Sequence, residues 1–260
     1  MGSRIAYLLA CMVLAAGLYG CGGGGAPYES RAEWRDRTED ACLKSGVVRA
    51  SSYVQASSRL KGPSACGLQA PLKVSGAMGG RVEIKPTATI GCPMTAALDH
   101  WVQNSVQPAA HRQFGMPVVE VKQIASYSCR GRNGSRRGRL SEHSFGNALD
   151  IAGFRLANGH EITVVRGWWR GTPRERAFLQ EAFAGACREF YTVLGPGSDR
   201  FHYNHIHVDL LVKNASRGRH YCRPQPGRGG VPVAEAEAPS GDLTTTASIK
   251  PIPFVGPGED

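Results

Sequence analysis

The alternation of apolar and polar residues predicts several β-strands in the second half of the chain. Residues 118–124 are rich in β-branched side chains, and residues 205–212 alternate before they become fully apolar. Residues 148–156 and 160–165 flank Asn158-Gly159, a dipeptide that favours the tight turn of a β-hairpin. These segments therefore predict strands that pair antiparallel.

Helical periodicity is clearest in residues 173–194. This segment follows Thr172 and opens with Pro173 and Glu175, the pattern of a helix N-terminus with a capping box. One apolar stripe recurs every three or four residues, at Leu179, Phe183, Ala186, Phe190 and Leu194. Because Gly195-Pro196 cannot continue a helix, we expect the helix to end there.

A second helix is expected over residues 94–112, where Pro108 predicts a bend or a break. Helices beside hairpin strands indicate an α+β fold, a small antiparallel sheet with helices packed beside it. Changes in composition set the expected boundaries: residues 22–38 form a disordered linker, residues 39–225 a globular domain, and residues 226–260 a disordered tail rich in Pro, Gly and Ala.

Residues 1–21 have the features of an export signal. Arg4 precedes an apolar run that ends near Leu18 and is too short to span a membrane comfortably. The run closes on Leu18-Tyr19-Gly20-Cys21, which resembles the processing box of bacterial lipoproteins. That resemblance implies a lipidated Cys21 that anchors the chain to a membrane, with ordinary signal cleavage as the alternative. We therefore expect an exported protein of the periplasm or outer surface.

The cysteines support export. With Cys11 in the signal and Cys21 lipidated, six remain: Cys42, Cys66, Cys92, Cys129, Cys187 and Cys222. An even number at wide spacing in an exported chain predicts three disulfides. The sequence leaves their pairing open, although a Cys187–Cys222 bond would join the last predicted helix to the end of the domain.

The net charge of +10 favours an anionic partner. An exported protein rarely meets nucleic acid, so we expect none, and anionic cell-wall polymer or lipid head groups are the better candidates. The alternative is a solvated basic surface that binds no partner.

The segment FHYNHIHVDL concentrates polar side chains on one face of a predicted strand. His205, His207 and Asp209 are two residues apart, so they project to one side of a strand. The apolar residues between them project to the other side and pack on the core. His202 is expected in the loop that enters this strand. Three groups able to bind a metal therefore face a common space.

A second polar pair lies 55 or more residues earlier in the chain. His143 is expected on a loop, and Asp150 at the start of the strand that follows it. Together with one histidine of the later strand they make a set of three nitrogen and oxygen ligands. Three such ligands and an open water position are typical of a catalytic zinc site. Zinc lowers the pKa of its water and polarises a carbonyl.

The pattern Ser141-x-His143-x-x-Gly146-x-Ala148-x-Asp150, followed by His205-x-His207, resembles the superfamily of D-Ala-D-Ala metallopeptidases, lysostaphin-type endopeptidases and hedgehog N-terminal domains. The resemblance implies one Zn²⁺ per chain, with His143, Asp150 and His207 as ligands and His205 as the catalytic histidine. The spacing His202-x-x-His205-x-His207 is most similar to penicillin-insensitive murein endopeptidases. Some dipeptidases of the superfamily carry glutamate where this chain has Asn204, so histidine is the better candidate for proton transfer.

The context from about residue 40 to residue 225 resembles the extensin-like C-terminal domain family. Related enzymes place an arginine at a point comparable to Arg130, which implies that Arg130 steadies an oxyanion. Arg130 is alternatively one more cation of a basic loop. Ser141 is expected to orient the loop, and Asp209 to orient a metal ligand.

The sequence therefore predicts a zinc-dependent hydrolase of peptidoglycan amide bonds, of the D,D-endopeptidase or D,D-carboxypeptidase type. One alternative is a cell-wall-binding module whose metal is not catalytic. Another is a hydrolase that acts on protein peptides instead.

Overall fold

A computed structural model describes residues 30–135, 138–211 and 220–226. The elements described below belong to the compact unit that begins at Arg31. The predicted signal, Cys21 and most of the predicted tail lie outside the described residues. Within the described ranges, no helix is long and apolar enough to cross a membrane.

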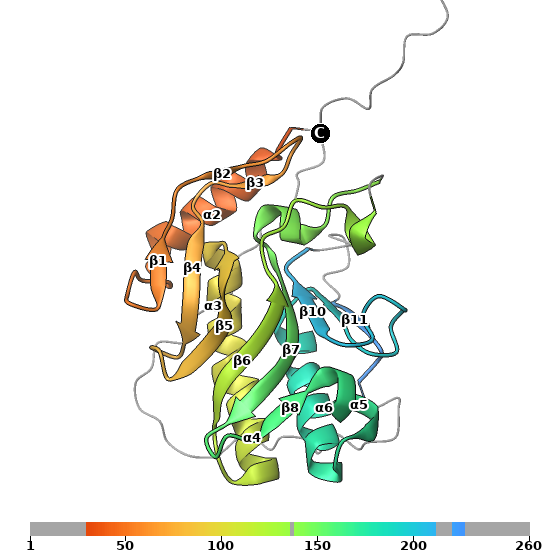
Figure 1. Cartoon of the computed structure of the whole chain (residues 1–260). Coiled ribbons are helices and arrows are strands. Elements are labelled where there is room, and N and C mark those ends of the chain that lie inside the picture. The colour runs from red at the N-terminus through yellow and green to blue at the C-terminus, as the bar shows by residue number, and fades with distance from the viewer. Residues whose placement is uncertain (1–29, 136–137, 212–219, 227–260) are drawn as a thin grey trace, which may run out of the picture. The chain divides into compact units, whose positions relative to one another are not determined.

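A mixed sheet of nine strands forms the centre of the domain (Figure 1). The strands are β1 (Val54–Ala56), β4 (Leu72–Ala77), β5 (Val82–Ile90), β6 (Val118–Ala125), β7 (Ala148–Leu156), β8 (Glu161–Thr163), β9 (Thr192–Leu194), β10 (Ile206–Asp209) and β11 (Tyr221–Arg223). Their order is β1-β4-β5-β6-β7-β10-β9-β11, and β8 pairs with β7. A separate pair joins β2 (Leu60–Lys61) to β3 (Gly67–Leu68).

The predicted α+β class is confirmed, but the small antiparallel sheet is wrong in size and in strand direction. The pairs β5–β6 and β9–β11 are parallel, and the other pairs are antiparallel. Pro86 interrupts the alternation of β5, and a proline within such a run counts against a strand. Strands β9 and β11 have three residues each, too few to show a period of two.

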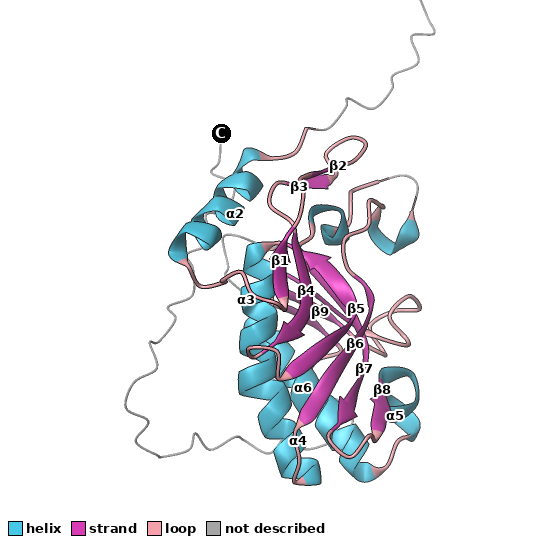
Figure 2. Ribbon diagram, turned by 60° about the vertical axis from the view of Figure 1, so that its left-hand side comes forward, coloured by secondary structure: helices cyan, strands magenta, loops and turns pink. Residues whose placement is uncertain are grey.

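The helices are α2 (Glu33–Ser45), α3 (Cys92–Trp101), α4 (Gln107–Phe114), α5 (Val164–Arg170) and α6 (Pro173–Glu189). One helical path connects the parallel strands β5 and β6, since α3 continues through the π-helical turn η2 (Val102–Val106) into α4. That irregular turn lies just before Pro108, where a bend or break was predicted. Helices α3, α4 and α6 lie together along the sheet (Figure 2).

Helix α6 has the predicted capping box, in which Thr172 and Glu175 bond each other's backbone N–H. It ends at Glu189, five residues before the predicted end, because Phe190 is extended and the chain enters β9. Pairing of β9 with β10 therefore prevails over the helical apolar pattern. The first four residues of the predicted stripe are buried in the core as expected.

The hairpin at Asn158-Gly159 is confirmed, because β8 pairs antiparallel with β7. Helix α2 begins at Glu33, within the segment expected to be a linker. The three predicted disulfides are present and join Cys42 with Cys92, Cys66 with Cys129, and Cys187 with Cys222.

Candidate metal centre

Strands β7 and β10 bring two of the predicted ligands face to face. His207 is the direct partner of Asp150 in their antiparallel register. Ile206 and Val208 point into the core, so the predicted division of β10 into a polar and an apolar face is confirmed. Cross-strand partners on one face have neighbouring side chains. The sheet itself therefore sets the distance between Asp150 and His207.

The third side chain of the group, His143, comes from the loop before β7, which we call the site loop (residues 141–147). It contains the 3₁₀ turn η4 (Glu142–Phe145). Ser141 caps this turn by accepting from the backbone N–H of His143 at 3.4 Å. Gly146 closes it with φ of 64°, and a Cβ there would lie 2.5 Å from Leu68. Glycine therefore satisfies both the left-handed backbone and the close approach of Leu68.

His143, Asp150 and His207 form a buried group that could hold a metal ion. Asp150 Oδ1 lies 2.8 Å from His207 Nδ1 and 3.1 Å from His143 Nε2, and the two nitrogens are 3.2 Å apart. Bonds of about 2.0–2.1 Å in a tetrahedral site separate the ligand atoms by roughly 3.3 Å. The three separations are therefore close to those that a tetrahedral zinc ion requires.

Hydrogen bonds on the far side of each ring direct its other nitrogen toward the group. Nδ1 of His143 donates to the carbonyl of Ser126 at 2.7 Å, which leaves the lone pair on Nε2. Nε2 of His207 donates to Asp209 Oδ2 at 3.0 Å, so Nδ1 carries the lone pair when the ring is neutral. The contact with His207 is the one that Asp209 would make if it orients a ligand, as the sequence predicted.

Burial disfavours the charged forms of Asp150 and His207, but their opposite charges stabilise each other. Burial alone raises the pKa of Asp150, but the neighbouring rings of His143 and His207 outweigh burial and hold it well below its usual value. Burial likewise lowers the pKa of His207, but Asp150 and Asp209 outweigh this and raise it to about 9. The raised pKa of His207 favours a proton on its Nδ1, which faces the Asp150 carboxylate. A cation bound there would replace that proton.

His202 and His205 lie next to this group. The ring of His202 lies 5.2 Å from that of His205 and 5.6 Å from that of His207. Nδ1 of His205 donates to the Asn204 side chain at 2.9 Å, and its Nε2 lies 3.5 Å from Asp150 Oδ1. Burial lowers the pKa of His205 to about 4, so His205 is neutral at pH 7.

The five side chains open onto one cavity of about 370 Å³. Arg130, Ser141 and Asp209 also contribute to its lining, so the cavity brings together all eight predicted catalytic, metal-binding and orienting residues. Residues 40–223 match the family described as Extensin-like protein C-terminus. The chain belongs to this family. No curated protein and no solved structure is significantly similar to it.

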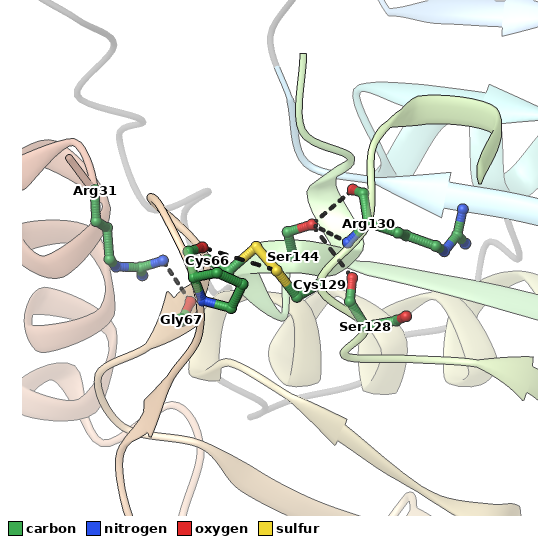
Figure 3. Close-up of a disulfide and its surroundings, with 8 residues drawn as sticks. Arg31, Cys66, Gly67, Ser128, Cys129, Arg130 and Ser144 are labelled. Atoms are coloured by element: carbon green, nitrogen blue, oxygen red, sulfur yellow. Dashed lines mark hydrogen bonds between the residues drawn. A yellow bond between two sulfur atoms is a disulfide. The ribbon is translucent and has the colours of Figure 1, made fainter. Parts of the chain in front are cut away.

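Within the extensin-like domain, Arg130 contacts the outer edge of the group. Its Nη2 lies 3.4 Å from Asp150 Oδ2, the carboxylate oxygen that faces away from the histidines, and its side chain is about one-third exposed. Its backbone is bound to the site loop, because Arg130 N–H donates to Ser144 Oγ and that hydroxyl bonds the Arg130 and Ser128 carbonyls (Figure 3). One segment thus carries Arg130 and supports His143.

A disulfide of the extensin-like domain fixes this same segment. Cys129 lies between Ser128 and Arg130 and is bonded to Cys66, which precedes β3 (Figure 3). The backbone N–H of Ser128 also donates to the His143 carbonyl at 3.1 Å. The Cys66–Cys129 bond therefore ties a remote part of the chain to the backbone that bonds His143.

Sequence reasoning missed Asp199. Its Oδ1 accepts from His202 Nδ1 at 2.7 Å and from the backbone N–H of Phe201 and His202. Burial lowers the pKa of His202, although Asp199 opposes this. An aspartate three residues before a histidine of the motif was the available signal. The carbonyl of Ser126 could not be found in this way, because a backbone acceptor leaves no mark in the sequence.

Proposed function

We propose that the chain is a zinc-dependent hydrolase of amide bonds in peptidoglycan peptides, of the D,D-endopeptidase or D,D-carboxypeptidase type. The observation that carries the proposal is the convergence of a buried His-Asp-His group with His202, His205 and Arg130 in one cavity. Perturbed titratable groups gathered in a cavity are typical of an active site. The resemblance of the two-part motif to D-Ala-D-Ala metallopeptidases supports the reaction class.

His143, Asp150 and His207 would hold the zinc. Two imidazoles and one carboxylate are a ligand set found in catalytic zinc sites with an open position. When bound, zinc would supply a Lewis acid and lower the pKa of a water at neutral pH. Asp209 and the Ser126 carbonyl keep the two imidazoles in the required tautomers.

His205 is the proposed proton acceptor. The Nδ1–H of His205 donates to the Asn204 side chain, so the lone pair is on Nε2, which faces Asp150. The low pKa of His205 keeps the ring uncharged at neutral pH, where it can accept a proton and pass it to the leaving amine. His202, held by Asp199, lies beside it as a second candidate for proton transfer.

Arg130 is the proposed stabiliser of the negative charge that develops on the substrate carbonyl oxygen. Its guanidinium lies at the open edge of the group and is only partly buried, so a substrate can reach it. A guanidinium keeps its charge at every working pH and donates several hydrogen bonds in one plane.

Peptidoglycan is the proposed substrate. Three disulfides are typical of exported proteins, which meet the cell wall. Arg130 and Arg132 both line the cavity, and peptidoglycan peptides carry carboxylates that guanidinium groups bind.

The net charge of +10 favours a second candidate, a cell-wall-binding module whose metal is not catalytic. Such a module would retain zinc and bind the wall without releasing any product. Turnover therefore separates the two functions.

The test incubates the full, oxidised, zinc-loaded protein with cross-linked peptidoglycan and identifies the muropeptides by mass spectrometry. Loss of cross-linked dimers or of a terminal D-Ala, abolished by a chelator and absent in His205→Ala, would support the hydrolase and name its bond. Unchanged muropeptides from folded, zinc-containing protein that sediments with the wall would favour the binding module. Casein in a parallel reaction separates a protein peptidase from both.

A further inference from the structure

Helix α2 contacts the site loop through one arginine. Arg35 forms two parallel hydrogen bonds to the Glu142 carboxylate, with Nη1–Oε2 and Nη2–Oε1 distances of 2.8 Å each. The partners are 107 residues apart in the chain, and their side chains are only 11% and 3% exposed. A two-pronged arginine–carboxylate pair fixes orientation as well as distance.

Aromatic rings hold the same guanidinium in place. It lies 3.7 Å from the centre of the Phe145 ring, which belongs to the site loop, and 4.4 Å from that of Trp34 on α2. Stacking and the two-pronged bond both require a planar guanidinium, and a lysine ammonium cannot provide either. Arg35 therefore contacts the site loop at Glu142 and at Phe145, one residue before and two residues after His143.

Glu142 also bonds the far end of the site loop, which in turn bonds the residue after β10. Its Oε2 also accepts from Asn147 Nδ2 at 2.7 Å, and its carbonyl accepts from the Asn147 N–H at 3.1 Å. The Asn147 carbonyl accepts in turn from the Leu210 N–H at 3.3 Å, just beyond β10. The Glu142 carboxylate thus connects α2 to both ends of the site loop, and the Asn147 backbone continues the connection to the residue after β10.

We propose that Arg35 is a positioning residue of the metal centre, which holds the site loop so that His143 meets Asp150 and His207 and thereby sets the affinity for the metal. This inference rests on the proposed zinc site. It gives α2 a role at the metal centre, although the sequence pattern had assigned residues 33–38 of this helix to a linker.

Ion pairs that do not involve Arg35 also attach α2 to the domain. Arg31 bonds Asp36, Glu39 and the Gly67 carbonyl, and Glu39 accepts from the backbone N–H of Gln69 and Ala70. These contacts anchor α2 beside β3, together with the Cys42–Cys92 disulfide. Removing Arg35 therefore leaves the helix attached and tests the site loop in particular.

The experiment compares the zinc dissociation constants of full, oxidised variants by competition with a chromophoric chelator. Removing a group that hydrogen-bonds a metal ligand typically weakens metal binding roughly 10–100-fold. Arg35 acts on His143 one step further away, through Glu142 and Phe145, so we expect losses at the lower end of that range, about tenfold, in Arg35→Ala and in Arg35→Lys, which keeps the charge but loses the fork and the stacking. Arg37→Ala is the matched control, because Arg37 lies on the same helix and is 65% exposed, and it should bind zinc as the wild type does.

A second control separates positioning from general loss of stability. Leu98→Ala removes a buried side chain of α3 and should lower the melting temperature without changing zinc affinity. The double variant Arg35→Met/Glu142→Gln removes both charges, so no unpaired charge is left buried. This double variant is used instead if Arg35→Ala does not fold. Folded Arg35 variants with zinc affinity within twofold of the wild type would overturn the proposal. So would unfolding of every Arg35 variant, because Arg35 would then serve the fold rather than the site.

This readout needs no substrate, so the two proposals can fail separately. If no peptidoglycan is cleaved but Arg35→Lys weakens zinc binding, the proposed activity fails and the positioning role stands. If the protein turns over muropeptides, we expect Arg35→Lys at saturating zinc to lower kcat more than it changes KM, since Arg35 lies behind the site loop. The d–d spectrum of the cobalt-substituted protein should shift in Arg35→Lys and not in Arg37→Ala.

Discussion

His207 stands directly opposite Asp150 across the β7–β10 pair, and its Nδ1 lies 2.8 Å from Asp150 Oδ1. Two residues that are 57 positions apart in the chain thus become neighbours through strand register alone. A slip of one residue in that register would turn either side chain to the opposite face of the sheet. The core residues Ile206 and Val208 hold the register, so the packing of the sheet also positions the proposed ligands.

Loss of either residue of this pair should abolish tight zinc binding. His207→Ala or Asp150→Ala leaves two ligands, too few for the closed part of a catalytic zinc site. Metal analysis after dialysis against a mild chelator should find stoichiometric zinc in the wild type and almost none in these variants. The exposed His111→Ala serves as control. Stoichiometric zinc in both site variants would show that the ligand assignment is wrong.

His205→Ala should separate binding from turnover. His205 is assigned to proton transfer and not to the ligand set, so the variant should retain zinc. General acid–base groups typically contribute about 10²–10⁴-fold to a rate, and we expect a loss of kcat in that range. The same muropeptide assay measures it, and wild-type turnover in the variant would remove His205 from the proposed chemistry.

The Cys66–Cys129 disulfide should influence the site as well as stability. Its partners are 63 residues apart, and closing a loop of that size stabilises a fold by about 4 kcal/mol in the chain-entropy account. Cys66→Ser/Cys129→Ser should therefore lower the melting temperature and weaken zinc binding, because Ser128 and Arg130 bond the site loop.

The matched control is Cys187→Ser/Cys222→Ser, which opens the bond between α6 and β11. It should reduce stability by a similar amount and leave zinc affinity near that of the wild type. Equal zinc affinities in the two double variants would indicate that the Cys66–Cys129 bond serves stability only.

The capping box of α6 predicts a defined dependence of stability on pH. Burial raises the pKa of Glu175, but hydrogen bonds with Thr172 and His160 outweigh this and lower it below its usual value of 4.5. The ionised carboxylate is therefore favoured in the folded state. Its contribution is complete above the unfolded pKa and is lost as the pH falls through the folded one. Urea unfolding between pH 3 and pH 6 should show a weaker pH dependence for Glu175→Gln than for the wild type.

The histidine motif could be interpreted from the sequence because strand geometry is simple. Alternation put His205, His207 and Asp209 on one face, and the structure shows this face lining the cavity. The start of α6 followed from Thr172 and Glu175, which act locally. Its end did not, because Phe190 to Leu194 obey a helical pattern while pairing with β10 decides their conformation.

Partners that act across long sequence separations left no such signal. Nothing near Arg35 indicates Glu142, since the pair is formed only when α2 packs against the site loop. The parallel β5–β6 pairing likewise depends on the helical path that joins the two strands. Strand β5 was not predicted, because Pro86 interrupts its pattern. Asp199 was within reach, because its turn with His202 spans only three residues.

The place of β10 near the end of the folded chain has a consequence for the timing of assembly. A chain delivered from its N-terminus presents His143 and Asp150 well before His207, and β10 can pair with β7 only when nearly all of the domain has arrived. Until then the two early members of the proposed ligand set would be incomplete and would hold an ion weakly. If the group binds a metal as proposed, the order of the strands would make metal capture one of the last events in the maturation of the domain.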